Sequence, residues 1–204
     1  MNVHSLFVEA MSPDKTRLIL DATEEVIAQQ GIMNTSMSKV AKHAGVAAGT
    51  IYLHFTDKSE LISKLRERNI RDFSLVLLAG HDATLSFQQQ FENLWANSYN
   101  FHLRYPEKVK LREMMRLLPD YESSWQQFMD LFTPLTEFFG QGVAQGVLKP
   151  LPGPILYSLG FGPIGEFSHQ STNQGLVMSQ ELQKLAVLAC WDAIALNPSI
   201  SISE

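Results

Sequence analysis

The stretch AKHAGVAAGTIYLHF, residues 41–55, determines how the first part of this chain folds. Gly45 gives the backbone the freedom that a tight turn needs, and Val46 can fill the angle between the helices on either side. Small residues follow the turn, so the start of the next helix can approach another molecule closely. This order predicts a helix-turn-helix over about residues 36–55, whose second helix enters the major groove of DNA.

The second helix of this motif has two chemically different sides. Thr50, Tyr52 and His54 offer hydroxyl and imidazole groups for phosphates or base edges. Ile51 and Phe55 lie one helical turn apart and are expected to face the core. Taken singly, Thr50 and Tyr52 are equally compatible with surface positions of a helical hairpin, so the functional prediction depends on the whole motif.

Apolar residues recur at helical spacing through the first 75 or so residues. The predicted helices cover about residues 13–31, 36–44 and 47–53, and a fourth begins at residue 57. Ser12 and Pro13 are typical of an N-cap and a first helical position. Asp57 followed by Glu60 has the spacing of a capping box and is expected to open the fourth helix.

The remainder of the chain continues the helical pattern, and no convincing strand alternation is present. Apolar stripes predict helices over residues 87–102, 109–118, 125–139 and 182–194. Pro134 lies inside the third stripe and predicts a kink there. The glycines and prolines of residues 154–169 predict a distorted helix or two short pieces, so we expect an all-α protein.

Charge is unevenly distributed along the 204 residues, whose formal net charge is -5. Residues 31–71 hold seven basic and three acidic side chains, a balance of +4, whereas residues 72–204 hold seven basic and thirteen acidic ones, a balance of -6. This asymmetry favours a polyanionic partner for the first part, although a solvated face would give the same counts.

The composition also predicts the cellular compartment. The single cysteine, Cys190, excludes an intramolecular disulfide framework and suits a reducing compartment, and its apolar surroundings predict a buried residue. The N-terminus lacks the features of a signal peptide. The uncharged stretch at residues 150–165 is too short and too rich in proline to span a bilayer. We therefore expect a soluble cytoplasmic protein without a membrane partner.

In its helix-turn-helix region the sequence resembles the TetR family of bacterial transcriptional repressors. The resemblance covers residues 13–71 and is carried by Ser36, Val40, Ala41, Ala44, Gly45, Val46, Gly49, Thr50, Ile51, Tyr52, His54, Phe55, Lys58 and Leu61, with Ile19, Ala22 and Gly31 in the leading helix. It implies an all-α fold with an N-terminal three-helix helix-turn-helix DNA-binding domain, residues 12–72. A C-terminal helical domain, residues 73–204, would bind a ligand and form the dimer.

The resemblance also implies a set of DNA-binding residues. Ser36 would cap its helix and touch phosphate, Lys58 would bind phosphate, and Ala48 and Leu53 occupy positions used for base readout. The full predicted set is Ser36, Lys39, Lys42, Ala47, Ala48, Thr50, Tyr52, Leu53, His54 and Lys58.

One position departs from the family pattern. Ala47 stands where serine is common, so an N-cap hydroxyl is lost, which costs up to about 1 kcal/mol of helix stability. The small apolar residues Ala47, Ala48 and Leu53 can contact thymine methyl groups but cannot form bidentate hydrogen bonds to G or A. Lys39, Lys42 or DNA shape are therefore expected to carry part of the readout.

An apolar effector site is expected in the C-terminal domain, where large adaptable side chains are frequent. The predicted effector residues are Trp95, Tyr99, His102, Met114, Trp125, Phe128, Phe132 and Phe167. For each residue alone, an ordinary core position is the simpler interpretation. The resemblance implies that the 154–169 segment and the final helix form the homodimer interface, and a dimer suits two half-sites, which need two symmetry-related readers.

The predicted function is thus a ligand-responsive repressor that binds a palindromic double-stranded operator as a dimer. The alternatives are a helical protein-interaction module without DNA binding and, less favoured, an enzyme. The six histidines show no metal-ligand spacing, and no P-loop, GxGxxG or Gly-x-Ser-x-Gly motif is present, so we predict neither a metal, a cofactor nor catalysis.

Overall fold

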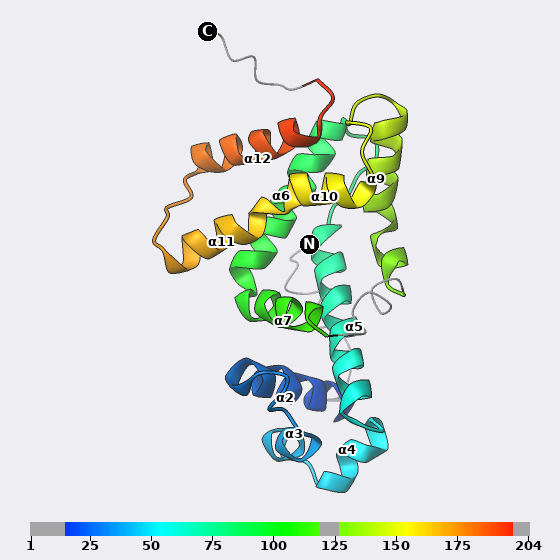
Figure 1. The fold of residues 1–204 in the computed structure, drawn as a ribbon, viewed down its shortest axis with the longest axis vertical. Coiled ribbons are helices and arrows are strands. Elements are labelled where there is room, and N and C mark those ends of the chain that lie inside the picture. Colours follow the sequence, from blue (N-terminus) through cyan, green and yellow to red (C-terminus); the bar gives the residue numbers. More distant parts are fainter. Residues whose placement is uncertain (1–14, 119–126, 198–204) are drawn as a thin grey trace. The chain divides into compact units, whose positions relative to one another are not determined.

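The computed structural model describes residues 15–118 and 127–197 (Figure 1). Its helices are α2 Lys15–Gln30, α3 Met37–His43, α4 Ala48–His54, α5 Lys58–Leu77, α6 Phe87–Arg104, α7 Pro106–Arg116, the 3-10 helix η1 Met129–Phe132, α9 Thr133–Ala144, α10 Gly153–Phe161, α11 Pro163–Asn173 and α12 Gln180–Ile194. Within the described residues there is no strand, only one isolated bridge between Leu148 and Ala195. The predicted all-α fold is confirmed.

The chain forms two compact units, and each is described by itself. The first comprises the residues up to Asp72 together with Glu107–Phe128, and the second comprises Phe73–Pro106 and Met129–Glu204. A break near residue 72 agrees with the predicted boundary, but the segment 107–128, which holds most of α7, departs from the predicted linear division into 12–72 and 73–204. The functional division remains a prediction.

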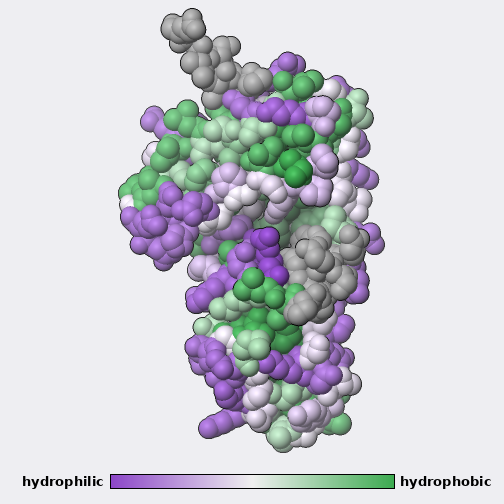
Figure 2. Space-filling view, in the orientation of Figure 1, coloured by the Kyte–Doolittle hydropathy of each residue, from purple (hydrophilic) through white to green (hydrophobic). Residues whose placement is uncertain are grey.

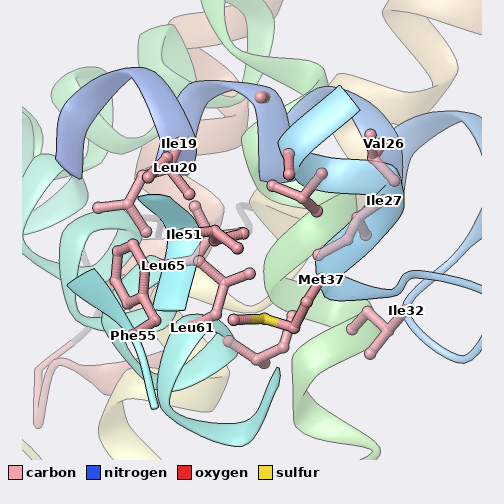
Figure 3. Packing of buried hydrophobic residues seen from close by; sticks show 14 of the residues in the cluster. Ile19, Leu20, Val26, Ile27, Ile32, Met37, Ile51, Phe55, Leu61 and Leu65 are labelled. Atoms are coloured by element: carbon pink, nitrogen blue, oxygen red, sulfur yellow. The ribbon is translucent and has the colours of Figure 1, made fainter. Parts of the chain in front are cut away.

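The core of the first unit explains why α7 belongs to it (Figure 3). Ile27, Ile51, Leu61 and Leu65 are fully or almost fully buried in one cluster, and Leu111 of α7 lies in the same cluster. The members of this cluster are Ile19, Leu20, Ala22, Val26, Ile27, Ile32, Met37, Val40, Ala41, Ile51, Phe55, Leu61, Ile62, Leu65, Leu111 and Met115. The apolar face of α7 therefore packs against residues 19–65, which are distant from α7 in the sequence.

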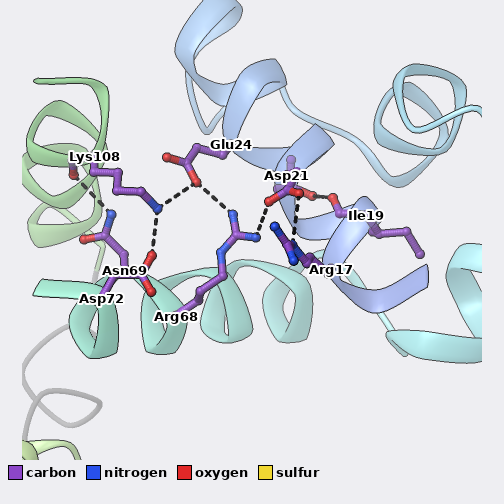
Figure 4. Close-up of polar contacts among 9 residues, drawn as sticks. Arg17, Ile19, Asp21, Glu24, Arg68, Asn69, Asp72 and Lys108 are labelled. Carbon is purple, nitrogen blue, oxygen red and sulfur yellow. Dashed lines mark hydrogen bonds and ion pairs between the residues drawn. The ribbon is translucent and has the colours of Figure 1, made fainter. Parts of the chain in front are cut away.

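An ion-pair network adds polar links between α2, α5 and α7 (Figure 4). The Arg68 guanidinium donates to the carboxylates of Asp21 and Glu24. The Lys108 ammonium lies 2.8 Å from Asp72 Oδ2 and 3.5 Å from Glu24 Oε2. The side chains of Arg68, Glu24, Lys108 and Asp72 are at most 20% exposed, so these pairs are less screened by water than surface pairs are.

The start of α5 is capped differently from the predicted capping box. Asp57 Oδ1 accepts from the Glu60 N–H at 2.9 Å, which is the expected half. Glu60 Oε2, however, accepts from the Thr56 N–H at 2.6 Å and the Thr56 hydroxyl at 2.7 Å, one residue earlier than a capping box requires. These bonds hold the pKa of Glu60 below its ordinary value, the Thr56 N–H contributing most.

The second unit is organised around α6. Ser86 caps this helix in a complete capping box with Gln89. Phe91, Leu94 and Trp95 of α6 are 0–1% exposed, and the helix packs against α11 and α12. Asn97 donates to the carbonyls of Leu77, the last residue of α5, and of Ala79 just after it, so α6 is tied to the end of α5.

Two prolines of the second unit correct or confirm the helix predictions. Pro134 lies in the first turn of α9, preceded by η1, so the predicted kink inside a long helix over residues 125–139 is wrong. Proline lacks only an N–H that the first turn leaves unbonded, so it starts this helix without cost. The 154–169 segment is two helices, α10 and α11, divided at Gly162 before Pro163, as one of the two predicted outcomes required.

Some sequence predictions lie outside the described residues. They are the Ser12–Pro13 start of the first helix, the stop at Pro119, the part of the third stripe up to residue 126 and the tail from residue 198.

Candidate nucleic-acid interface

The turn between α3 and α4 has the geometry that a helix-turn-helix needs. Gly45 adopts a φ of 66°, a left-handed conformation that side chains disfavour. The Gly45 N–H donates to Lys42 O at 3.3 Å and the Val46 N–H to Ala41 O at 3.0 Å. This is the Schellman pattern, which satisfies the last carbonyls of α3 and stops the helix sharply.

Helix α4 is fixed by one side and exposed on the other. Ile51 is 0% exposed and Phe55, directly after the helix, is 2% exposed, and both point into the core of the first unit (Figure 3). On the opposite side Tyr52 is 58% and Leu53 84% exposed. The predicted core face of this helix is confirmed, whereas of the three predicted outer residues only Tyr52 is exposed and Thr50 and His54 are half-buried.

The N-termini of α3 and α4 are capped unequally. Ser36 is the N-cap of α3, and its hydroxyl accepts from the Lys39 N–H at 3.4 Å. Ala47 is the N-cap of α4 and makes no side-chain cap hydrogen bond, as the sequence predicted. Ala47, Ala48 and Gly49 are all exposed, so the start of α4 is open to a partner.

Two of the three predicted DNA-contacting lysines are held by the turn after α2. The Lys39 ammonium donates to Gln30 Oε1 at 3.0 Å and to Asn34 O at 2.8 Å. The Lys58 ammonium donates to Met33 O at 3.3 Å. These bonds gather the N-termini of α3 and α5 around one turn and so concentrate positive charge there.

Lys42 is different. It is exposed on α3, and its ammonium makes no hydrogen bond or ion pair within residues 15–118 and 127–197. Its neighbour His43 is paired with Glu25 through Nε2 at 2.6 Å. Lys42 therefore keeps a free ammonium group that a phosphate can engage.

His54 has a structural partner that the sequence did not indicate. Its Nδ1 hydrogen-bonds with Thr16 Oγ1 at 3.0 Å, which ties the end of α4 to the start of α2. One ring nitrogen is thus used within the fold, and Nε2 is the one left for a partner. No local sequence signal could have indicated this bond, because it joins residues 38 positions apart.

Sequence reasoning also missed the turn residues Met33 and Asn34. Met33 is 84% exposed, and its carbonyl oxygen accepts a hydrogen bond from the Lys58 ammonium. Only the tertiary arrangement brings this turn to the N-termini of α3 and α5, so the local sequence contained no signal for it.

Two family models match the chain. The model described as "Bacterial regulatory proteins, tetR family" matches residues 19–65, and the one described as "Tetracyclin repressor-like, C-terminal domain" matches residues 86–195. The second match alone covers more than half of the chain. The chain belongs to the TetR family.

Relatives of this TetR-family chain are transcriptional regulators. An uncharacterized HTH-type transcriptional regulator of Haemophilus influenzae is 28% identical over 181 residues, covering 89% of this chain and 96% of the relative. The HTH-type transcriptional regulator AcrR of Shigella flexneri is 47% identical over 60 residues, 28% of each chain.

Solved structures agree with this assignment. A putative TetR-family regulator from Vibrio parahaemolyticus superposes with a TM-score of 0.81 at 28% identity, covering 89% of this chain and 99% of the other. The protein is therefore a TetR-family transcriptional regulator with a DNA-binding helix-turn-helix, and the predicted family and fold class are confirmed.

The residues predicted for the effector site do not form one group. In the second unit Trp95 stacks on Tyr99 with ring centroids 5.2 Å apart, and Phe167 lies 6.3 Å from Trp95. His102 and Phe132 instead contact Phe73, at 6.4 and 6.1 Å.

The other predicted effector residues lie elsewhere. Met114 packs against the core of the first unit. Phe128 ends the first unit, and Trp125 lies outside the described residues. As an effector site, the whole set stays a prediction.

The described part of the chain holds neither a membrane-spanning helix nor a cluster of metal ligands. No helix there is long and apolar enough to cross a membrane. No group of three or more histidine, cysteine or acidic residues there could hold a metal ion. Cys190 is 4% exposed, as predicted, and burial raises the pKa of its thiol.

Proposed function

We propose that this regulator is a repressor that binds a palindromic operator as a homodimer and leaves it when a small, largely apolar effector binds. The observation that carries the DNA-binding part is α4, which Ile51 and Phe55 fix in the core while Tyr52 and Leu53 stay exposed. A helix held rigidly by one face and free on the other is what insertion into a major groove requires.

Charge supports this proposal. Residues 31–71 carry a balance of +4, and within them Lys39 and Lys42 lie on α3 and Lys58 lies at the start of α5. Phosphate contacts position a protein on the duplex and make its affinity fall with salt. A regulator of this kind acts on DNA in the cytoplasm, and we propose no catalytic activity.

A second copy of the chain is the proposed partner of α12. The inner side of this helix is buried through Val187, Cys190, Trp191 and Ile194. A second stripe on the helix, comprising Leu182, Leu185 and Ala189, is exposed, Leu185 to 60%. A helix with two apolar stripes needs two partners, and the second unit supplies only one.

The face shown in Figure 2 has hydrophobic surface over the region of α10 and α12. Ile155 and Leu159 of α10 are 47% and 40% exposed, and Leu182 and Leu185 of α12 are 38% and 60% exposed. A two-fold interface built from these helices would cover both sets, which supports the homodimer.

The effector is proposed to bind near Trp95. The indole is fully buried against Tyr99 and Phe167, and its Nε1 has no nitrogen or oxygen partner in the described part of the chain; the Cys190 thiol is the weak acceptor beside it. The Tyr99 hydroxyl lies 3.1 Å from Ser171 Oγ. Apolar rings with a few polar atoms favour a mainly apolar ligand that brings one hydrogen-bond acceptor to Trp95.

Release requires a difference in affinity. The effector must bind more tightly to a conformation in which the two helix-turn-helix units are wrongly spaced for the operator than to the DNA-binding conformation. An effector with equal affinity for both conformations would not shift the equilibrium between them.

The DNA-binding proposal is tested with Tyr52→Ala combined with Lys58→Ala. Hydrogen bonds to charged groups contribute about 1.5–3 kcal/mol each, so the loss of two should lower operator affinity by about 100-fold or more. Fluorescence anisotropy at several salt concentrations measures this. A dimer loses one Lys58 contact in each half, so the salt slope should fall by about 1.8.

The control for that experiment is Lys64→Ala. Lys64 is an exposed lysine of α5 that pairs with Glu67 at 3.1 Å, and its loss should change operator affinity little. Unchanged affinity of the double variant, or binding that is insensitive to salt, would favour the alternative of a helical protein-interaction module.

The effector proposal is tested by Trp95→Phe. Compounds that release the protein from its operator are first selected from a panel containing apolar molecules with one acceptor and multiply anionic molecules. The variant keeps the aromatic ring but loses the N–H, so the concentration needed for release should rise by about three- to tenfold. Release by multiply anionic compounds alone, with no change in the variant, would contradict the proposal.

A further inference from the structure

We propose that the exposed face of α4 reads the methyl groups of thymine, and that the operator half-site carries thymines at the base pairs beneath Ala48 and Leu53. This inference rests on the proposed DNA binding and adds the chemistry of the sequence that is read.

The exposed face of α4 has few hydrogen-bonding groups, and beside it Thr50 and His54 are half-buried. Leu53 is 84% exposed and Ala48 and Gly49 are exposed beside it. Tyr52, 58% exposed, adds one hydroxyl at the end of an aromatic ring. The described face therefore holds no arginine, lysine, asparagine or glutamine that could grip G or A by two hydrogen bonds.

Polar groups near this face are engaged elsewhere. Lys39 donates to Gln30 and to the Asn34 carbonyl, and His54 Nδ1 is bonded to Thr16. Lys42 is free, but an ammonium group is a point charge that suits phosphate better than the paired acceptors of a base. The Thr50 hydroxyl and His54 Nε2 can each make only single hydrogen bonds, so the main base discrimination by α4 is assigned to apolar contact.

Apolar contact in the major groove distinguishes bases by one group. Thymine presents its C5-methyl there, whereas cytosine at the same place presents an amino group and a bare C5. Leucine and alanine side chains that cover this methyl remove it from water, a gain that is lost when the methyl is absent.

Two base analogues isolate this methyl group. Uracil keeps every hydrogen bond of thymine and lacks only the methyl. 5-Methylcytosine adds the methyl to a C·G pair without changing its hydrogen bonds. Comparing thymine with uracil removes the group, and comparing cytosine with 5-methylcytosine restores it.

The experiment uses the full-length protein and the operator obtained by selection from random DNA. Each thymine of the half-site is replaced by uracil in turn, and each T·A pair by C·G or by 5-methyl-C·G. Because one buried methyl group is worth about one CH₂ transfer, affinity should fall about fourfold for uracil at each contacted position. 5-Methylcytosine should bind more tightly than cytosine there by a similar factor.

The variant Leu53→Ala assigns the contact. For this variant, the ratio of the affinity for thymine to the affinity for uracil should approach one at the base pairs under Leu53. At the other positions this ratio should stay as in the parent. Leu117→Ala is the matched control, an equally exposed leucine outside α4 at 86% exposure, and should leave every ratio unchanged.

The outcomes separate this inference from the proposed function. Failure to bind any DNA overturns the proposed function. Binding to a selected operator that lacks thymine, or that tolerates uracil at every position, overturns the methyl readout alone. A thymine-to-uracil ratio unaltered in Leu53→Ala overturns the role of Leu53.

Discussion

Replacing Leu182 and Leu185 together by glutamate is expected to yield a monomer that binds the operator at least about 100-fold more weakly than the parent. Both leucines lie on the exposed stripe of α12, 38% and 60% exposed in the single chain. A buried charge without a partner costs about 3–5 kcal/mol, and a two-fold interface would contain each glutamate twice. That cost corresponds to a factor of about 100 or more in the dimerisation constant.

Sedimentation velocity measures the oligomeric state, and anisotropy with a complete operator and a half-site measures the consequence. The double variant should bind the half-site as the parent does, because α4 is untouched. The control Gln180→Glu with Lys184→Gln changes the charge of the same helix by the same amount on its other side. A double variant that stays dimeric would show that the stripe on α12 is not the interface.

The second large effect is expected from Ile51→Ala, compared with Leu53→Ala on the same helix. Ile51 is 0% exposed in the core of the first unit, whereas Leu53 is 84% exposed. Removing a buried isoleucine side chain leaves a cavity, so the free energy of unfolding should fall by about 2–5 kcal/mol. Leu53→Ala should change it by no more than about 0.5 kcal/mol.

Urea unfolding followed by circular dichroism gives both free energies. Operator affinity is measured for the same two variants. Leu53→Ala should alter base discrimination although the protein remains stably folded. Equal destabilisation by the two substitutions would mean that α4 does not pack as described, and it would remove the physical basis for its role as a rigid reader.

Local sequence chemistry was sufficient to predict the helix-turn-helix. The left-handed turn at Gly45 and the burial of Ile51 and Phe55 follow from residue type and helical spacing, and both are found in the structure. The missing cap hydroxyl at Ala47 was equally predictable, because it depends on one side chain at one position.

The contacts of the lysines could not be predicted in this way. Lys58 donates to the Met33 carbonyl, 25 residues away, and Lys39 reaches back to the end of α2. Such bonds depend on how α2, α3 and α5 pack, which residue spacing within one helix does not determine.

Tertiary packing also decided the place of α7 and the effect of Pro134. The apolar spacing of α7 correctly predicted a helix but not its partner, since Leu111 and Met115 serve the core of the first unit. Pro134 lay within a continuous apolar stripe, yet it begins a helix, because η1 interrupts the pattern before it. Periodicity identifies the apolar face of a helix but not the surface that the face covers.

The central claim is that the first unit reads a specific double-stranded sequence as half of a dimer. Selection of bound sequences from a random DNA pool at two salt concentrations tests it most directly. We predict an enriched palindrome with half-sites about one helical turn (~34 Å) apart, bound more weakly at the higher salt concentration. Absence of any enriched sequence, or an affinity that salt does not change, would contradict it.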